Sequence, residues 1–114
     1  MAKPLKFRNV PTIIGAEKYR SKREAAKHQD LLLLQRAGKI TGLQREVPYV
    51  LAAGVKIAGE PRARPALRYV ADFVWIDAAT GARVVADAKG VQTDVYRVKK
   101  HLMKTTHGID VVEL

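Results

Sequence analysis

Two aspartates and a lysine with strand-like spacing are the residues of this sequence best suited to do chemistry. Asp72 lies inside the apolar run LRYVADFVWI (67–76), and Asp87 and Lys89 stand two residues apart in the next β-rich run. Aspartate is disfavoured in strand interiors, so both acids need a reason beyond packing. Two carboxylates held close together are stabilised by a cation, and hard oxygen ligands suit magnesium. The pattern therefore indicates a site for a divalent metal.

The hairpin between the two runs brings these side chains onto one face. Alternate residues of a strand point the same way, so the second aspartate and the lysine share a face. A turn at 78–81 pairs Ile76 with Arg83. The same register places Asp72 directly opposite Asp87, and the neighbouring registers place it diagonal to that residue or opposite the lysine. Each register keeps the three groups together, and two carboxylates about 5 Å apart repel by roughly 3 kcal/mol at an effective dielectric near 20.

An ordinary salt-bridge network on a solvated sheet face explains the same residues. In that interpretation Arg68 and Lys89 neutralise the two aspartates, and spacing alone does not separate this network from a metal site. The position of the acids, among apolar residues in a chain with a formal charge of +10, favours the metal. An acidic pocket works against binding an anion unless a cation bridges the acid to the phosphate.

The elements that must position this cluster begin with a helix expected over 21–37. Ser21 and Glu24 fit the S-x-x-E capping box, and a glycine supplies the C-terminal stop. Four consecutive leucines, 31–34, cover most of the helix circumference. We therefore expect the second half of the helix to be buried on several sides and the first half to be exposed.

Glu24 has two explanations that the sequence does not separate. As the third residue of a capping box, it needs no further role. It also shares a helical stripe with His28, Leu31 and Gln35, and one side of that stripe leads into the core. A helix docked on the sheet could therefore direct Glu24 toward the acidic cluster.

The remaining pattern predicts an α/β fold with the element order α-β-β-β-α-β and a mixed sheet flanked by two helices. Pro48 suits an edge strand or a bulge. A second helix is expected from Thr93 or Asp94 to about residue 106, with four apolar side chains at core spacing: Val95, Val98, Leu102 and Met103. Strands are expected at 43–51, 67–76, 83–89 and 109–114.

The length of 114 residues fits one domain. We interpret residues 1–20 as a basic N-terminal arm and residues 21–114 as the folded domain. Segment 52–66, with its glycines and prolines, is expected to form a basic loop or a loosely paired hairpin extension. The chain has no cysteine, no apolar run that could span a membrane and no signal-peptide pattern at its start. We therefore expect a cytoplasmic protein of a bacterial host, with no membrane partner.

The formal charge of +10 and the pI near 10.2 favour a polyanionic partner. Neutralised phosphates release counterions, which supplies much of nucleic-acid affinity, although solubility or an anionic membrane would also fit the charge. The residues expected to hold nucleic acid are Arg20, Lys22, Arg23, Lys27, Arg62, Arg64 and one stripe of the second helix, Arg97, Lys100 and Lys104. Three histidines are better explained as surface or structural residues than as metal ligands: His28, His101 and His107.

Several segments taken together resemble a known nuclease core. The element order, with Glu24 on the first helix, Asp72 on the second strand and 87–89 (DAK) on the third, resembles the PD-(D/E)XK nuclease superfamily. Ala71 stands where the proline is usually written, and many members of the superfamily lack that proline. Four segments are similar to a family of small phage and prophage endonuclease-like proteins assigned to the superfamily: SKREA (21–25), YVADFV (69–74), DAKG (87–90) and YRVKKHL (96–102).

The resemblance implies a restriction-endonuclease-like core and a role for each residue of the cluster. Asp72 and Asp87 would ligate Mg²⁺, with Mn²⁺ as a substitute, and the Ala88 carbonyl would be a further ligand. Lys89 would orient or help deprotonate the attacking water. Glu24 would contact the metal directly or through water. The implied enzyme is an Mg²⁺-dependent endonuclease that hydrolyses phosphodiester bonds in DNA, and a homodimer if it resolves branched or junction DNA.

Two other classes of function fit parts of the same sequence. A non-catalytic nucleic-acid-binding module of a phage would share the charge and the basic stripe but would not need Asp72 and Asp87. A structural or partner-binding phage protein is expected to expose an apolar patch and to bind no DNA.

Overall fold

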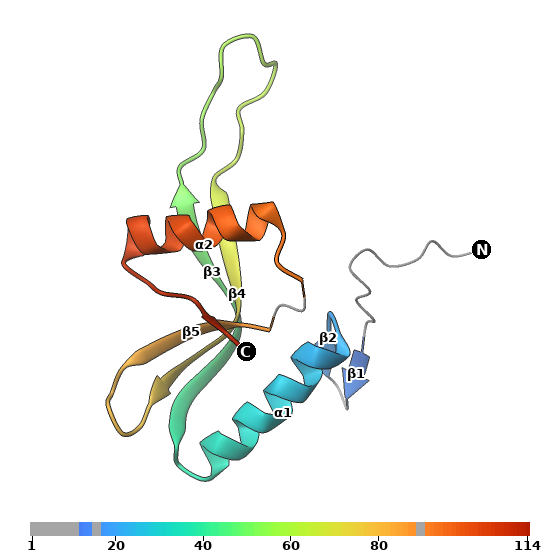
Figure 1. Cartoon of the computed structure of the whole chain (residues 1–114). Helices are drawn as coiled ribbons and strands as arrows, with labels where there is room; N and C mark the ends of the chain where they lie inside the picture. The colour runs from blue at the N-terminus through green and yellow to red at the C-terminus, as the bar shows by residue number, and fades with distance from the viewer. Residues whose placement is uncertain (1–11, 15–16, 89–90) are drawn as a thin grey trace, which may run out of the picture.

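The computed structural model describes residues 12–14, 17–88 and 91–114. Over these residues the predicted α/β class, with a mixed sheet and two helices, is confirmed (Figure 1). None of the helices in these ranges is long and apolar enough to span a membrane. The elements in chain order are β1 (Thr12–Ile14), β2 (Glu17–Tyr19), α1 (Lys22–Arg36), β3 (Ile40–Ala52), β4 (Leu67–Asp77), β5 (Arg83–Asp87), α2 (Asp94–His107) and β6 (Val112–Glu113).

The main sheet has the strand order β3-β4-β5-β6, with β5 and β6 parallel and the other neighbours antiparallel. Pro48 lies on β3, an edge strand, as predicted. Ile76 pairs with Arg83 across the β4–β5 hairpin, which is the predicted register. Asp77 fixes the turn, because its carboxylate accepts hydrogen bonds at 2.8 and 3.1 Å from the amides two and three residues later.

All four strands of the main sheet have other bounds than predicted, although β4 differs by only one residue at its end. β3 begins at Ile40 rather than at residue 43, because a bulge between Thr41 and Gln44 lets the pairing with β4 continue. β5 ends at Asp87, and Lys89, expected at its end, lies outside the described residues. β6 is shorter than the expected strand at 109–114, because its parallel pairing with β5 covers two residues.

α1 packs on the sheet through one face. Its N-cap Ser21 accepts a hydrogen bond from the Glu24 amide at 3.1 Å, as the capping pattern predicted. The buried stripe includes Glu24, His28 and Leu31, whereas leucines 32–34 are exposed. The prediction of a buried second half and an exposed first half is therefore wrong. The 3.6-residue period turns the three following leucines away from the stripe that contacts the sheet.

α2 packs across β3 and β4 in front of the sheet (Figure 1). Thr93 caps its start by accepting a hydrogen bond from the Tyr96 amide at 3.1 Å. Tyr96 and Met103 are its buried residues, one heptad apart. The predicted core residues Val95 and Val98 are 65% and 57% exposed, so that part of the prediction is wrong. The helix meets the sheet along the stripe through Tyr96, one residue away from the stripe of valines.

The described segment before α1 packs on the core, whereas the segment between β3 and β4 extends away from it. β1 and β2, in the predicted basic arm 1–20, form an antiparallel pair, and Tyr19 is buried against α1. Residues 1–11 and 15–16 of that arm lie outside the described part of the chain. The segment between β3 and β4, by contrast, projects beyond α2 (Figure 1). We call residues 53–66 the ribbon; it has the form of the predicted hairpin extension, with an isolated bridge between Val55 and Arg64.

Candidate functional site

Asp72 and Asp87 lie side by side in the centre of the main sheet. β4 is buried on both faces from Ala71 to Trp75, and Asp72 and Asp87 are only 3% and 0% exposed. Phe73 pairs with Ala86, and the same register continued by one residue places Asp72 opposite Asp87. Asp72 Oδ2 accepts a hydrogen bond from the amide that follows Asp87 at 2.9 Å. Each acid is thus fixed in place by the hairpin that carries both.

Tyr69 and Tyr96 complete the buried side of this pair, and the sequence analysis missed both. The Tyr69 hydroxyl donates a hydrogen bond to Asp87 Oδ2 at 2.7 Å. Burial, followed by the charge of Asp87, raises the pKa of Tyr69 and of Tyr96 well above the usual value for tyrosine. Tyr69 therefore stays a hydrogen-bond donor. A tyrosine in an apolar strand is typical of a core, so no sequence signal distinguished this one.

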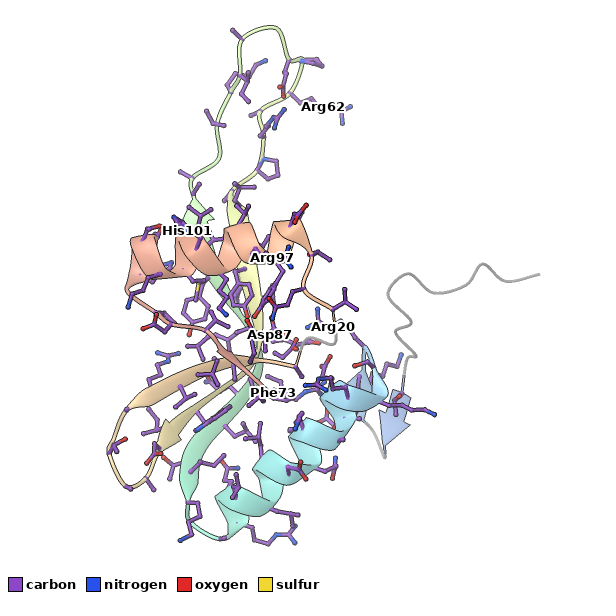
Figure 2. The ribbon with its side chains drawn as sticks, viewed as in Figure 1. Arg20, Arg62, Phe73, Asp87, Arg97 and His101 are labelled. Carbon is purple, nitrogen blue, oxygen red and sulfur yellow. The ribbon has the colours of Figure 1, made fainter. Side chains whose placement is uncertain are left out.

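Arg20 lies at the centre of three acids, although the sequence suggested only a contact with DNA. Its guanidinium bonds to Asp72 Oδ1 and, through Nε, to Glu24 Oε2 at 3.3 Å. Burial alone would lower its pKa, but the charges of Asp72, Glu24 and Asp87 together raise it. Figure 2 shows Arg20 and Asp87 near each other at the end of β5, below α2 and above α1 in this view. Arg20 is half exposed, so this cation also reaches solvent.

Glu24 contributes its amide to the helix cap and its carboxylate to this charged cluster. Its amide is capped by Ser21, but its carboxylate, with the residue 2% exposed, accepts hydrogen bonds from Arg20 and from Arg45. Arg45 on β3 bonds to Glu24 Oε1 at 3.1 Å and lies over the Tyr19 ring at 4.2 Å from its centroid. The explanation of the carboxylate as part of a capping box is therefore wrong. Arg45 was missed because its role depends on how α1 docks against β3.

The cluster offers carboxylate oxygens, the donors that suit a hard divalent cation such as Mg²⁺. Among the described residues, no group of three or more histidine, aspartate and glutamate side chains has the spacing to hold a metal ion. Here Arg20 supplies the positive charge, because it bridges Asp72 and Glu24. A metal ion held by Asp72 must therefore displace Arg20 from that carboxylate. The Ala88 carbonyl as a ligand stays a prediction, and Lys89 lies outside the described residues.

The histidines lie apart from the acidic pair. His28 is buried, shares a hydrogen bond of 2.6 Å with the Tyr19 hydroxyl and stacks on Phe73 at 5.7 Å. Burial and then the charge of Arg45 lower the pKa of His28, which favours its neutral form. His107 bonds to a backbone carbonyl of β3 at 2.7 Å, and His101 is exposed on α2.

The predicted nucleic-acid-binding residues fall into three regions. The first region is the start of α1, which carries Lys22, Arg23 and Lys27 shortly after Arg20. The second is the ribbon, which carries Arg62 and Arg64. The α2 stripe lines a shallow pocket of about 500 Å³ together with Asp110, and each of its three cations pairs with an acid. These ion pairs are Arg97 with Asp94 at 3.1 Å, Lys104 with Asp110 at 2.8 Å, and Lys100 with Glu113.

Comparison with protein families gives one match for this chain. A family model described as "Protein of unknown function (DUF1064)" matches residues 5–111. The chain belongs to this family. In this DUF1064 protein the matched region contains α1, β3, β4, β5 and α2, and hence the whole acidic cluster. Neither the curated proteins nor the solved structures gave a match.

Proposed function

We propose that this DUF1064 protein is an Mg²⁺-dependent endonuclease that hydrolyses phosphodiester bonds in DNA. The observation that carries the proposal is the buried pair Asp72 and Asp87, joined by a third buried acid and one half-exposed arginine. Burying three carboxylates is costly even where Arg20 and Arg45 pair with two of them, and a bound divalent cation would offset that cost. The formal charge of +10 supports an anionic substrate for the same molecule.

Asp72 and Asp87 are the residues that would hold the ion, Mg²⁺ or Mn²⁺, with the Ala88 carbonyl and Glu24 as further donors. When bound, the ion lowers the pKa of a coordinated water and offsets charge on the scissile phosphate. Tyr69 orients Asp87 through its hydrogen bond of 2.7 Å. In the proposal, Lys89 orients the attacking water.

Arg20 has a second use in this proposal. Half of its side chain is exposed, so once released from Asp72 it can turn toward a phosphate oxygen. A guanidinium binds phosphate with two parallel hydrogen bonds, which would fix the backbone beside the acids. Glu24 on α1, Asp72 on β4 and Asp87 on β5 follow the order expected from the resemblance to the PD-(D/E)XK superfamily, and this order supports the proposal.

A homodimer working in the cytoplasm of a bacterial host is the form that we propose for the enzyme. Exposed apolar side chains on α2 and β4 support self-association. Val95, Val98 and Leu102 line an apolar pocket of about 270 Å³ together with Leu51 and Leu67. Light scattering on the purified protein tests this point.

A non-catalytic nucleic-acid-binding module is the second candidate, and one observation favours it. Arg20 and Arg45 already neutralise Glu24 and Asp72, so the cluster can exist as a network of ion pairs. The nuclease would cut the DNA that it binds, whereas the binding module would leave it intact.

Incubation with labelled DNA in the presence of Mg²⁺ or of a chelator separates the candidates. Linear, flapped and four-way DNA are compared, because the acidic cluster does not define the shape of the substrate. The proposal expects at least one substrate to be cut with Mg²⁺ and none with chelator. Binding of all three substrates without cutting of any would favour the binding module.

A further inference from the structure

The ribbon, residues 53–66, extends from the sheet without packing on the body. Ala52 and Leu67 are the last pair between β3 and β4. Beyond them every ribbon residue is exposed except Glu60 and Ala66, which are half-buried. Figure 1 shows this segment standing clear of both helices. A segment of this length contributes little to the core, so its order and composition need another reason.

Contacts within the ribbon hold it in an extended, two-chain form. Val55 and Arg64 exchange backbone hydrogen bonds of 2.9 and 2.6 Å. At the tip, Arg64 holds the Glu60 carboxylate with two hydrogen bonds of 2.9 and 2.8 Å. A Cβ on Gly54 would lie 2.9 Å from the Arg64 carbonyl oxygen, so glycine permits the close approach of the two chains. The ribbon is thus a preformed element.

The ribbon presents positive charge and apolar side chains to solvent. Lys56, Arg62 and Arg64 are its cations, against the single acid Glu60. Arg62 makes no ion pair with any other described residue, and Figure 2 shows it pointing away from the ribbon. Nearby Val55 and Ile57 are 52% and 37% exposed. Cations beside small apolar groups suit the phosphates and base edges of a nucleic acid.

The distance between the ribbon and the acids fits a duplex. Asp72 follows Arg64 by eight residues, the last six of them on β4, which is a span of up to about 26 Å at the rise of a strand. That length equals about eight base pairs of B-form DNA. The major groove of B-form DNA admits a two-stranded β-ribbon, whereas that of A-form RNA is too deep and narrow for side chains to read.

We propose that the ribbon enters the major groove of duplex DNA about eight base pairs from the phosphate held at the acidic cluster. This inference rests on the proposed action on DNA, and it adds the form of the substrate: a duplex arm that extends beyond the cut.

Replacing residues 53–66 by Asn-Gly tests the proposal. Because Ala52 and Leu67 are paired, an Asn-Gly turn between them closes a tight hairpin and leaves the sheet intact. Affinity is measured with chelator present, by fluorescence anisotropy, for DNA duplexes of about 10 and about 30 base pairs. We expect the long duplex to bind about tenfold more weakly, with a shallower salt dependence, and the short duplex to bind as before.

Arg62→Ala, in the full-length chain, tests the same point without shortening the protein. Its matched control is Arg83→Ala, which removes the same charge from an exposed position at the β4–β5 turn, at the opposite end of β4. We expect Arg62→Ala to weaken binding of the long DNA duplex severalfold and Arg83→Ala to leave it nearly unchanged. For an RNA duplex of equal length, we expect Arg62→Ala and Arg83→Ala to change the affinity by the same factor.

Three results would overturn the inference. The first is that the shortened protein binds the long DNA duplex with unchanged affinity. The second is that it loses as much affinity for the RNA duplex as for the DNA duplex. The third is that the shortening converts a dimer into a monomer, which would make the ribbon a contact between copies. Failure of the proposed nuclease is distinguishable from these results. In that case the ribbon still strengthens binding of long DNA duplexes, but no DNA is cut with Mg²⁺.

Discussion

Arg20 decides the charge balance of the acidic cluster. The side chain contacts Asp72 and Glu24, and the charge of Asp87 also acts on it. Without a metal, removing it leaves buried carboxylates with less compensation. With a metal, the same arginine competes for Asp72, so the two cations oppose each other at one carboxylate.

Arg20→Ala is therefore expected to have opposite effects on stability and on metal binding. Without metal, the free energy of unfolding should fall by about 1 kcal/mol, a discounted value because half of the side chain is exposed. Mg²⁺ affinity should rise about fivefold, the factor equivalent to that energy. Urea unfolding and titration calorimetry measure the two effects. Arg36→Ala, at the exposed far end of α1, is the control, and equal Mg²⁺ affinity in both variants would contradict the competition.

Tyr69→Phe tests whether the Tyr69 hydroxyl supports the buried acid. The change keeps the ring but removes the donor to Asp87, so we expect a loss of about 1–2 kcal/mol in the free energy of unfolding. Tyr49 pairs with Tyr69 across β3 and β4, and its buried hydroxyl has no hydrogen-bond partner among the described residues. Tyr49→Phe is thus a matched control that should cost almost nothing. Equal losses in the two variants would mean that the hydrogen bond to Asp87 is unimportant.

At the scale of elements, the hairpin was predictable and the docking of α1 was not. Turn length and the two-residue period of a strand fix which residues face each other, so Asp72 and Asp87 could be paired from the sequence. Which face of a helix contacts a sheet depends on distant residues. For that reason leucines 32–34 looked buried, and Arg45 gave no signal. The prediction that Val95 and Val98 are buried is wrong for the same reason, since α2 packs on the sheet through Tyr96 instead.

We expect the stability of the docked α1 to depend on pH through His28, which is buried against Tyr19 and Phe73. Burial and Arg45 lower its pKa in the folded state, while Glu17 and Glu24 act in the opposite direction more weakly. Below the ordinary histidine pKa the unfolded chain binds the extra proton, so stability should fall as pH drops below about 6.5. Urea unfolding between pH 7.5 and 5.5, a range of about two units around that pKa, measures this effect.

His28→Gln should flatten that pH dependence, because glutamine carries no titrating proton. His101→Gln, on the exposed face of α2, should leave the slope unchanged. The interpretation of His28 as the pH-sensitive residue fails if the slope of the His28 variant equals that of the wild type.

At the scale of the whole molecule, an acidic centre lies within a basic protein. The formal charge is +10, yet three carboxylates are buried together beside the β4–β5 hairpin. The cations lie around them on α1, α2 and the ribbon. Under the proposed function, this arrangement would draw a polyanion onto the surface and present one of its phosphates to the acids. The polyanionic partner stays a prediction from composition, whereas the places of the cations could be known only from the fold.

Asp87→Asn separates cutting from binding and tests the central claim most directly. The variant keeps the shape of the side chain, so DNA affinity with chelator should match that of the wild type. Losing a residue that only hydrogen-bonds to a metal ligand lowers metal affinity or activity about 10–100-fold. Loss of a direct ligand should therefore reduce Mg²⁺-dependent cutting to below about 1% of the wild-type rate. Asp30→Asn, an exposed acid on α1, is the control and should cut normally. Cutting by Asp87→Asn at the wild-type rate would contradict the assignment of the acidic cluster as the active site.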